Sequence, residues 1–421
     1  MCVICTEDIL VLVKYTKIEC KCYNITEIPK ELVNLTSLEC VGCRVTEIPK
    51  EFVNLRELRC VGCPIITTIP KELVNLTLLG CYDCPLFTHL PKELINLTSL
   101  VCIWCPDLTE IPKELVKLEK LDCIDCPNIT EIPKELVNLK TLNCRGQMII
   151  SKELINLERL SSSYIKEIPK ELVKLKRLDC INCTSLTHIP KELVNLEILY
   201  CHNCLITEIP KEFVNLVSLN CEKCPLLNPN GIPKELTKLE ILSCYGCPNI
   251  THIPKEFVEL KALCCHNCNS LTHIPKELVN LQELNCNGCP IKEIPKELIN
   301  LGYIICDGCL NITYIPKELT KLKTLICSKC PFLTHIPKEL INLKYIVCDN
   351  CPNLIDAPPH LLMGDNKLMV EKNYQRYRKH QCSKLISIIL EELIQRTWEP
   401  VRAMEWCWDE EEKKFMGDML N

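Results

Sequence analysis

A five-residue phrase returns along this chain about every 21 residues, and that repetition limits the possible folds more than any other feature. The phrase is Ile-Pro-Lys-Glu-Leu or a close variant, and it occurs fifteen times, with its proline at Pro29, Pro49, Pro70 and onward to Pro337. A repeat of this length cannot bury its own apolar face, so it must stack on its neighbours. The sequence therefore predicts a solenoid that acts through a surface rather than a pocket.

The overall charge of the chain is nearly balanced. Net charge is −5, from 49 Lys and Arg against 54 Asp and Glu, whereas nucleic-acid-binding proteins carry a clustered positive excess. The N-terminal Met1–Asp8 has no basic lead, and Lys14 interrupts the apolar run Ile9–Val13, so we expect neither a signal peptide nor a membrane span. These features predict a soluble cytoplasmic protein that binds no nucleic acid, no membrane and no small-molecule substrate.

One repeat shows how the apolar residues are spaced. Leu35, Leu38, Cys40, Cys43 and Val45 fall in the five marked slots of the template L-x-x-L-x-L-x-x-N/C-x-L. From about residue 18 to about residue 363 the chain therefore resembles the leucine-rich repeat family. The resemblance implies an α/β solenoid in the form of a curved horseshoe, and proteins of this family mostly act by binding other proteins.

The segments between these slots predict the local structure. Leu38-Glu39-Cys40 alternates as a strand does, and stacking it on the next repeat builds a parallel β-sheet on the concave side. Proline suits the first turn of a helix, because it lacks the N–H that would be unpaired there, and Glu31 favours the positive helix end. We therefore expect a short convex α- or 3₁₀-helix in each repeat, beginning at Pro-Lys-Glu.

The repetition divides the chain into three segments. Residues 1–24 are predicted to form an N-terminal cap, and residues 25–363 a leucine-rich repeat array of about 16 units. Periodicity stops before residues 364–421, where an apolar stretch and three tryptophans (Trp398, Trp406 and Trp408) predict a small helical C-terminal cap or docking segment.

Cysteine is unusually frequent, with 36 residues, and fourteen repeats carry Cys-x-x-Cys, from Cys40/Cys43 to Cys348/Cys351. Such pairs can bind zinc or perform redox chemistry. Here both cysteines fall in inward slots of the repeat, and an extended path would hold their Cα atoms about 9–10 Å apart, too far for one zinc site. We therefore expect two columns of buried thiols that fill the core, with no metal and no cofactor.

Sequons of the glycosylation type, such as those beginning at Asn34, Asn75 and Asn128, also recur with the repeat. They are typical of secreted proteins. Because they follow the same period as the leucines, a role inside the repeat explains them more simply.

Comparison of the repeats separates scaffold from specificity. The leucines, the cysteines and Pro-Lys-Glu barely change, whereas the outward strand slots vary freely. Aromatic and imidazole groups gather in four of these slots, at Tyr200, His202, Tyr245 and His266, and we interpret them as an anchor patch for a partner protein. The Lys-Glu pairs on the opposite side are expected to keep the solenoid soluble.

The sequence predicts a non-enzymatic protein-binding scaffold, and two other functions are alternatives to it. One is a structural or self-assembling protein that uses the tryptophan-rich C-terminal segment. The other is an effector of the ubiquitin-ligase type, because Cys407-Trp408-Asp409 resembles the Cys-x-Asp motif of such enzymes. Residues 364–421 are too few for that catalytic domain, so we expect no enzyme activity.

The near-identical repeats with Cys-x-x-Cys strands also resemble leucine-rich repeat proteins of giant amoeba-infecting DNA viruses. That resemblance implies a viral protein located in the host cytoplasm. No single residue carries this inference.

Overall fold

The computed structural model describes residues 4, 8–146 and 148–355. They fall into two compact bodies that are treated separately: an N-terminal body (Met1–Leu260 and Asn267–Leu278) and a C-terminal body (the described residues of Lys261–His266 and Val279–Asn421). The predicted C-terminal cap at residues 364–421, with its tryptophans and Cys407, lies outside the described residues.

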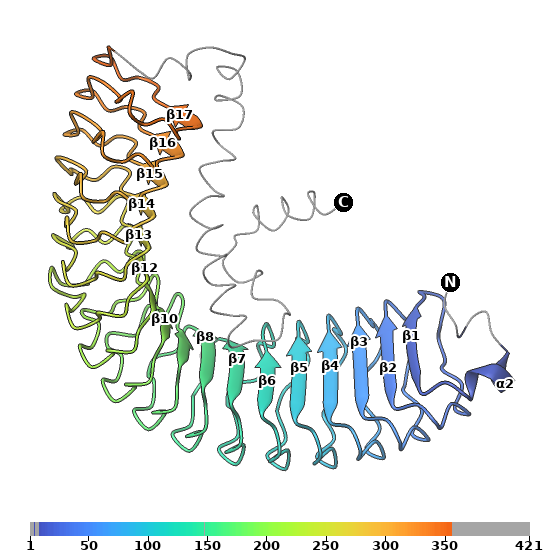
Figure 1. The fold of residues 1–421 in the computed structure, drawn as a ribbon. Coiled ribbons are helices and arrows are strands. Elements are labelled where there is room, and N and C mark those ends of the chain that lie inside the picture. Colours follow the sequence, from blue (N-terminus) through green and yellow to red (C-terminus); the bar gives the residue numbers. More distant parts are fainter. Residues whose placement is uncertain (1–3, 5–7, 147, 356–421) are drawn as a thin grey trace. The chain divides into compact units, whose positions relative to one another are not determined.

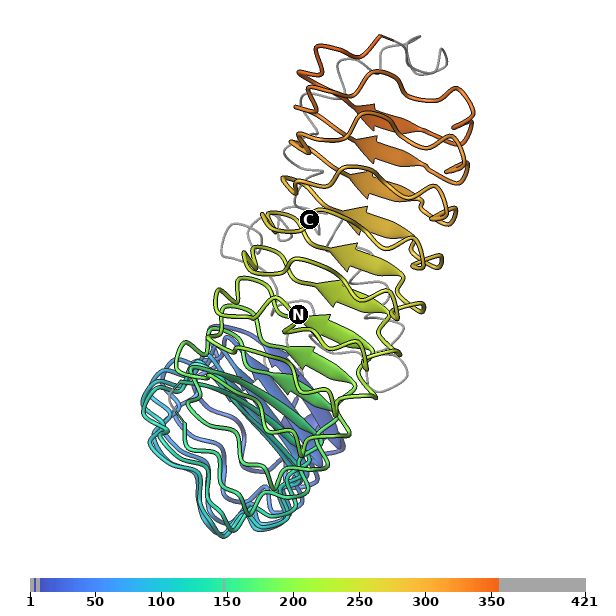
Figure 2. The ribbon, with the colours of Figure 1, turned by 90° about the vertical axis from the view of Figure 1, so that its left-hand side faces the viewer.

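Short parallel strands, one in each repeat, run through both bodies (Figures 1 and 2). The N-terminal body begins with the four-residue helix α2 (Ile9–Leu12), and its strands follow in chain order: β1 (Lys17–Lys21), β2 (Ser37–Val41), β3 (Glu57–Val61), β4 (Leu78–Tyr82), β5 (Ser99–Ile103), β6 (Lys120–Cys123), β7 (Thr141–Arg145), β8 (Arg159–Ser163), β9 (Arg177–Asp179), β10 (Ile198–Tyr200), β11 (Ser218–Asn220) and β12 (Ile241–Ser243). The strands of the C-terminal body are β13 (Ala262–Cys264), β14 (Glu283–Asn285), β15 (Tyr303–Ile305), β16 (Thr324–Ile326) and β17 (Tyr345–Val347).

Within each body, neighbouring strands pair in parallel with equivalent slots side by side. Leu38 lies opposite Leu58, and Cys40 lies opposite Cys60. The first strand, β1, lies inside the predicted N-terminal cap and pairs with β2 in the same register, with Ile18 opposite Leu38. The predicted parallel-sheet solenoid of about 16 units is confirmed, since each repeat contributes one strand to the sheet of its body.

The core is formed by the residues that the template marks. Leu35, Leu38, Cys40, Cys43 and Val45 all have 0% of their surface exposed. Equivalent residues of the other repeats are buried in the same way, except in the last described repeat, where Cys348 and Cys351 are partly exposed. The leucines and both columns of cysteines therefore point inward as predicted. Burial of a leucine side chain stabilises the fold by about 1.5–3 kcal/mol.

The predicted convex helices are wrong for the described residues, because two tight turns stand in their place. The N–H of Leu32 donates to the carbonyl of Pro29 at 3.3 Å, and the N–H of Leu35 donates to Leu32 at 3.1 Å. Between them the N–H of Val33 donates to Glu31 at 2.8 Å. A bond to the second residue back cannot belong to an α-helical ladder, so the segment turns twice and still brings both leucines inward.

A left-handed residue stands immediately before the second cysteine slot in the sixteen repeats of β2–β17, so the predicted extended path between the cysteines is also wrong. Gly42, for example, has φ of 66°. This conformation turns the chain and directs the second cysteine into the core, and it favours glycine, asparagine and aspartate. The residues in this slot are Gly42, Gly62, Asp83, Trp104, Asp125, Gly146, Tyr164, Asn182, Asn203, Lys223, Gly246, Asn267, Gly288, Gly308, Lys329 and Asn350.

The first and second cysteines of the Cys-x-x-Cys pairs form the first and second columns of thiols. Thiols of the second column connect consecutive repeats. Cys63 Sγ donates to the carbonyl of Cys40 at 3.5 Å, and Cys224 Sγ donates to the carbonyl of Cys201 at 3.1 Å. Burial raises the pKa of Cys144, a thiol of the first column, to about 12. The cysteines are therefore hydrogen-bonded parts of the core as well as apolar filler.

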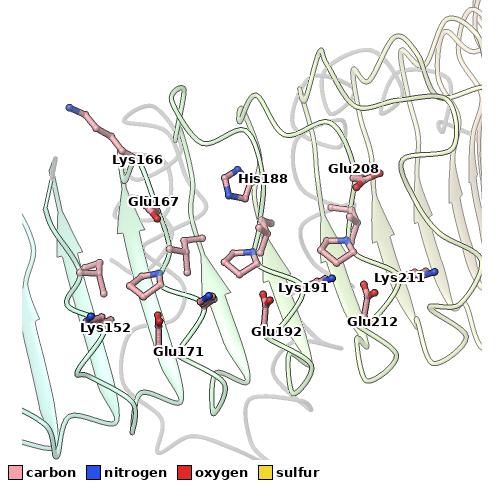
Figure 3. A pocket seen from close by; sticks show the side chains of 18 of the residues that line it. Lys152, Lys166, Glu167, Glu171, His188, Lys191, Glu192, Glu208, Lys211 and Glu212 are labelled. Atoms are coloured by element: carbon pink, nitrogen blue, oxygen red, sulfur yellow. The ribbon is translucent and has the colours of Figure 1, made fainter.

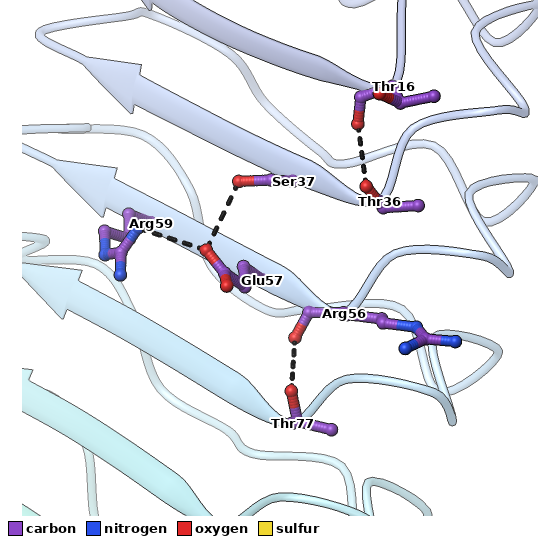
Figure 4. Close-up of polar contacts among 7 residues, drawn as sticks. All are labelled: Thr16, Thr36, Ser37, Arg56, Glu57, Arg59 and Thr77. Atoms are coloured by element: carbon purple, nitrogen blue, oxygen red, sulfur yellow. Dashed lines mark hydrogen bonds and ion pairs between the residues drawn. The ribbon is translucent and has the colours of Figure 1, made fainter.

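Asparagine and threonine side chains make similar links. Asn34 and Asn75 donate through Nδ2 to the carbonyls of Val13 at 3.0 Å and Val53 at 2.8 Å. N-linked glycans attach to that same nitrogen, so a structural role accounts for the recurring sequons. Thr36 Oγ1 and Thr77 Oγ1 likewise donate to the carbonyls of the preceding repeat, at 3.0 and 3.1 Å (Figure 4).

Candidate functional site

The sheet face is the surface formed by the outward strand slots. It carries the four residues predicted as an anchor patch. Tyr200 ends β10, and His202 and Tyr245 each lie two residues beyond the last strand residue of their repeat, all in the N-terminal body. His266 belongs to the C-terminal body, where its Nδ1 lies 3.2 Å from Cys264 Sγ. The structure thus places three of the four in one body.

Tyr200 is not the exposed anchor that the sequence suggests. Only 6% of its surface is accessible, and the guanidinium of Arg177 lies over its ring, 5.1 Å from the centroid. Arg177 Nε also donates to Asp179 Oδ2 at 3.0 Å, and burial raises the pKa of Asp179 although the neighbouring guanidinium opposes the shift. Tyr200 therefore belongs to a packed polar cluster on the sheet face.

His202 and Tyr245 lie around one lysine. Lys223 Nζ lies over the Tyr245 ring, 5.5 Å from its centroid, and both aromatic residues are half-buried. Burial lowers the pKa of His202 from its usual 6.5, and the positive charge of Lys223 lowers it further. The imidazole is consequently neutral at pH 7, and its titration lies below the range that an exposed histidine would give.

Glu222 is a second charged residue of the patch around His202, Tyr245 and Lys223. Its Oε1 accepts a hydrogen bond from Ser243 Oγ, and its backbone N–H donates to Asn220 Oδ1 at 3.1 Å. Burial raises the pKa of Glu222 above the usual 4.5, against the opposing effects of Ser243 and Lys223. The patch therefore combines aromatic surface with charged groups held in fixed positions, which suits recognition of another protein.

An apolar stripe on β2–β5 was missed in the sequence. Val41, Val61, Tyr82 and Ile103 occupy the fifth slot of successive strands and lie side by side in register. All four are half-buried. The signal was available, because every fifth slot in these repeats is apolar, but it appears only when equivalent slots are read across repeats rather than along one strand.

Polar groups border this stripe at the start of the strands. Glu57 Oε2 accepts from Ser37 Oγ at 3.4 Å and forms an ion pair with Arg59 Nη1 at 3.5 Å (Figure 4). Both partners of the ion pair are partly exposed, so their net contribution to stability is about 0–1 kcal/mol. They fix side-chain positions on the sheet face more than they stabilise it.

A groove crosses the opposite side of the N-terminal body, along the Pro-Lys-Glu segments (Figure 3). Its volume is about 1520 Å³, and it follows five repeats from Met148 to Glu235. Lysines and glutamates such as Lys191 and Glu192 alternate along it, with the Ile-Pro pairs between them. This mixed charge is what a solvated surface needs, and the predicted solubilising role of these residues stays a prediction.

The described residues hold no cluster of three or more His, Cys, Asp or Glu side chains arranged to bind a metal ion. Within residues 4, 8–146 and 148–355, no helix has the length and apolarity that crossing a membrane requires.

Comparison with known proteins agrees with the geometry. Residues 195–216 and 280–301 match the family described as Leucine Rich Repeat. The fold is a leucine-rich repeat solenoid. A leucine-rich repeat protein of Leptospira interrogans has a similar structure, with 23% identity, a TM-score of 0.62, and coverage of 80% of this chain and 98% of that one.

A second similar structure is the functional domain of InlJ from Listeria monocytogenes, which is described as including a cysteine ladder. Identity is 24% and the TM-score is 0.59, with 77% of this chain and 69% of that chain covered. At these identities the likeness shows the fold alone. No curated protein sequence matches the chain.

Proposed function

We propose that this protein is a non-enzymatic scaffold that binds a partner protein through the sheet face of its leucine-rich repeats. The observation that supports this most is the contrast between slots: buried residues repeat almost unchanged, whereas outward residues differ from strand to strand. A rigid sheet with independently variable side chains suits the recognition of one protein surface.

The patch around Tyr245, His202 and Lys223 is the first surface to test. Aromatic side chains at interfaces supply much of the binding energy, because they bury large area at low cost in conformational entropy. Tyr245 is half-buried within its own body, so part of its ring remains available to a partner. Tyr200, being almost fully buried, contributes through packing with Arg177.

The test is affinity capture with the full chain, using matched variants in place of truncations. A partner retained by the wild type should be weakened by about 1–3 kcal/mol in Tyr245→Ala. Lys191→Ala, in the groove on the opposite side, should leave capture unchanged. Loss of capture in Lys191→Ala, with capture retained in Tyr245→Ala, would place the partner in the groove and contradict binding through the sheet face.

The self-assembling alternative predicts a different result. It requires that the full chain associates with itself, and that Tyr245→Ala and Lys191→Ala self-associate as the wild type does. Sedimentation of the wild type and of Trp406→Ala measures this directly. Self-association that depends on Trp406, with no captured partner, would replace the scaffold proposal.

A further inference from the structure

Trp104 occupies a left-handed backbone position that suits a bulky residue poorly. Its φ is 55°, whereas twelve of the sixteen residues in this slot are glycine, asparagine or aspartate. The left-handed conformation crowds the β-carbon, so a bulky residue is strained there. Burial does not explain the choice, because 56% of the tryptophan surface is exposed. A large aromatic ring is therefore displayed at the edge of the sheet face at a cost to stability.

Hydrogen bonds hold the ring in place. Trp104 Nε1 donates to Asp125 Oδ2 at 2.8 Å, in the next repeat. Asp125 is fixed in turn by Arg145, whose Nη1 lies 3.2 Å from Oδ1. The indole is thus oriented before any ligand arrives, which reduces the entropy lost on binding.

Aspartates occupy the same left-handed slot in the repeats on both sides of Trp104, Asp83 before it and Asp125 after it. The N–H of Asp83 donates at 2.8 Å to the carbonyl of Ile103, the residue directly before Trp104, so Asp83 lies beside the tryptophan in the preceding repeat. Asp107 follows three residues later in the same repeat, and Asp83 and Asp107 are both exposed. Neither forms an ion pair with a described residue, whereas Arg145 is paired with Asp125.

The apolar stripe lies directly inside this edge. Ile103 ends the stripe beside Trp104, and the N–H of Trp104 donates to the carbonyl of Ile124 in the next repeat at 3.1 Å. Ile124 is 6% exposed and continues the apolar surface. A ligand that reaches the indole therefore meets both apolar side chains and the Asp83 carboxylate.

We propose that Trp104 and Asp83 form an edge site that takes an arginine or lysine side chain from a basic and apolar segment of a partner protein. The cation lies on the face of the indole, where the ring quadrupole attracts it, and the Asp83 carboxylate supplies further attraction. Apolar neighbours of that cation in the partner pack on Ile103 and Tyr82. Charge complementarity selects this partner, since an acidic segment would be repelled.

This site lies on β4–β6 and goes beyond the patch on β10–β12. It shares with the proposed function only the assumption that a protein is bound. The probe is a blocked ten-residue peptide of alternating Arg and Ile, with a Glu-Ile peptide of equal length as its counterpart. Binding is followed on the full chain by the indole ¹⁵N–¹H resonances, and the Trp104 signal is assigned by its loss in Trp104→Phe.

The Arg-Ile peptide should shift the Trp104 resonance, and the Glu-Ile peptide should not. Trp104→Asn should weaken binding of the Arg-Ile peptide about three- to tenfold. Its folding is protected, because Asn182 and Asn203 already occupy the same left-handed slot. Asp83→Asn should weaken binding less and should make it less sensitive to salt.

Equal affinity of wild type and Trp104→Asn would overturn the edge site, and so would equal binding of the Glu-Ile peptide. Tyr245→Ala serves as the separating control, because it lies in the other patch and should leave peptide binding unchanged. Failure of the peptide experiment leaves the Tyr245 capture experiment to decide the scaffold proposal on its own.

Discussion

Strands β2–β5 and strands β10–β12 belong to the same body and carry the same repeat, yet they end differently. The first group has five residues in each strand and the second has three. In the first group the thiol of Cys84 donates to the carbonyl of Cys60 at 3.6 Å, whereas in the second Cys224 donates to Cys201 at 3.1 Å. Thiol bonds to the carbonyls of β2, β3 and β4 measure 3.4–3.6 Å, whereas the bond from Cys126 to Cys102 of β5 is 3.1 Å, as short as that to Cys201.

A single side chain explains the difference at β10 and β11. The register of β2 and β3 continues to Val41 and Val61. In the later repeats the equivalent N–H of Glu222 turns to Asn220 Oδ1 at 3.1 Å, so pairing stops at Asn220. The thiol of the next repeat then becomes a closer donor to the carbonyl of Cys201. At this position a side-chain acceptor on the sheet face takes the N–H, and a thiol donates to the backbone carbonyl of the core.

The same arrangement recurs independently in the C-terminal body. The N–H of Asn287 donates to Asn285 Oδ1 at 3.3 Å, and Cys289 Sγ donates to the carbonyl of Cys265 at 2.9 Å. Short strands and close thiol bonds therefore occur together wherever an outward side chain captures the fifth N–H.

The largest expected effect tests whether the two regions share one core. Leu58→Ala in β3 and Leu199→Ala in β10 should each lower the free energy of unfolding by about 2–5 kcal/mol, because both side chains are fully buried and leave a cavity. Urea unfolding measures both, with the exposed Lys113→Ala as a control expected to change it by less than about 0.5 kcal/mol. A much smaller loss for Leu199 would mean that the short-strand region is loosely packed.

A smaller effect should separate the two regions. Cys224→Ala removes the close donor to the Cys201 carbonyl, whereas Cys63→Ala removes a longer and weaker bond to Cys40. Both variants lose the same side-chain volume, so Cys224→Ala should be the more destabilising by about 1 kcal/mol. Equal losses in urea unfolding would show that the thiols act as filler alone and that the comparison of bond lengths has no energetic meaning.

The smallest effect concerns acid stability of the short-strand region. The folded-state pKa of His202 is lowered below its usual 6.5, so the unfolded chain binds the proton more readily. The stabilising contribution of the neutral ring is present above pH 6.5 and is lost as pH falls through the lowered pKa. Unfolding from pH 7.5 to 5 should show this loss in the wild type relative to His202→Gln. A constant difference between the two across this range would contradict the assigned burial.

The sequence predicted those parts of the fold that follow from the regular spacing of the repeats. Leucine spacing identified the strands and the inward slots, and burial of Leu38, Cys40 and Cys43 follows it. The convex segment was mistaken for a helix because proline and glutamate favour both a helical first turn and a β-turn. The hydrogen bond from the Val33 N–H to the Glu31 carbonyl distinguishes the two structures, but no residue type in the sequence signals this bond.

The left-handed slot was missed for a related reason. Glycine fills it in some repeats, but aspartate, asparagine, lysine, tyrosine and tryptophan fill it in others, so no single repeat reveals it. Within the candidate patch, the positions of Tyr200, His202 and Tyr245 on the sheet face followed from alternation. The burial of Tyr200 did not, because Arg177 reaches it from the neighbouring strand, and contacts across repeats depend on side-chain length.

The hydrogen bonds from the asparagines to main-chain carbonyls, and those that the second-column thiols make between repeats, point the same way: each repeat donates to the repeat before it. Asn54 reaches back to Val33, and Cys63 reaches back to Cys40. A copied repeat inserted between two existing ones would therefore find its acceptors already in place and would offer the same carbonyls to the repeat behind it. Such a chain can change length by whole-unit duplication or deletion without altering any residue at the junctions.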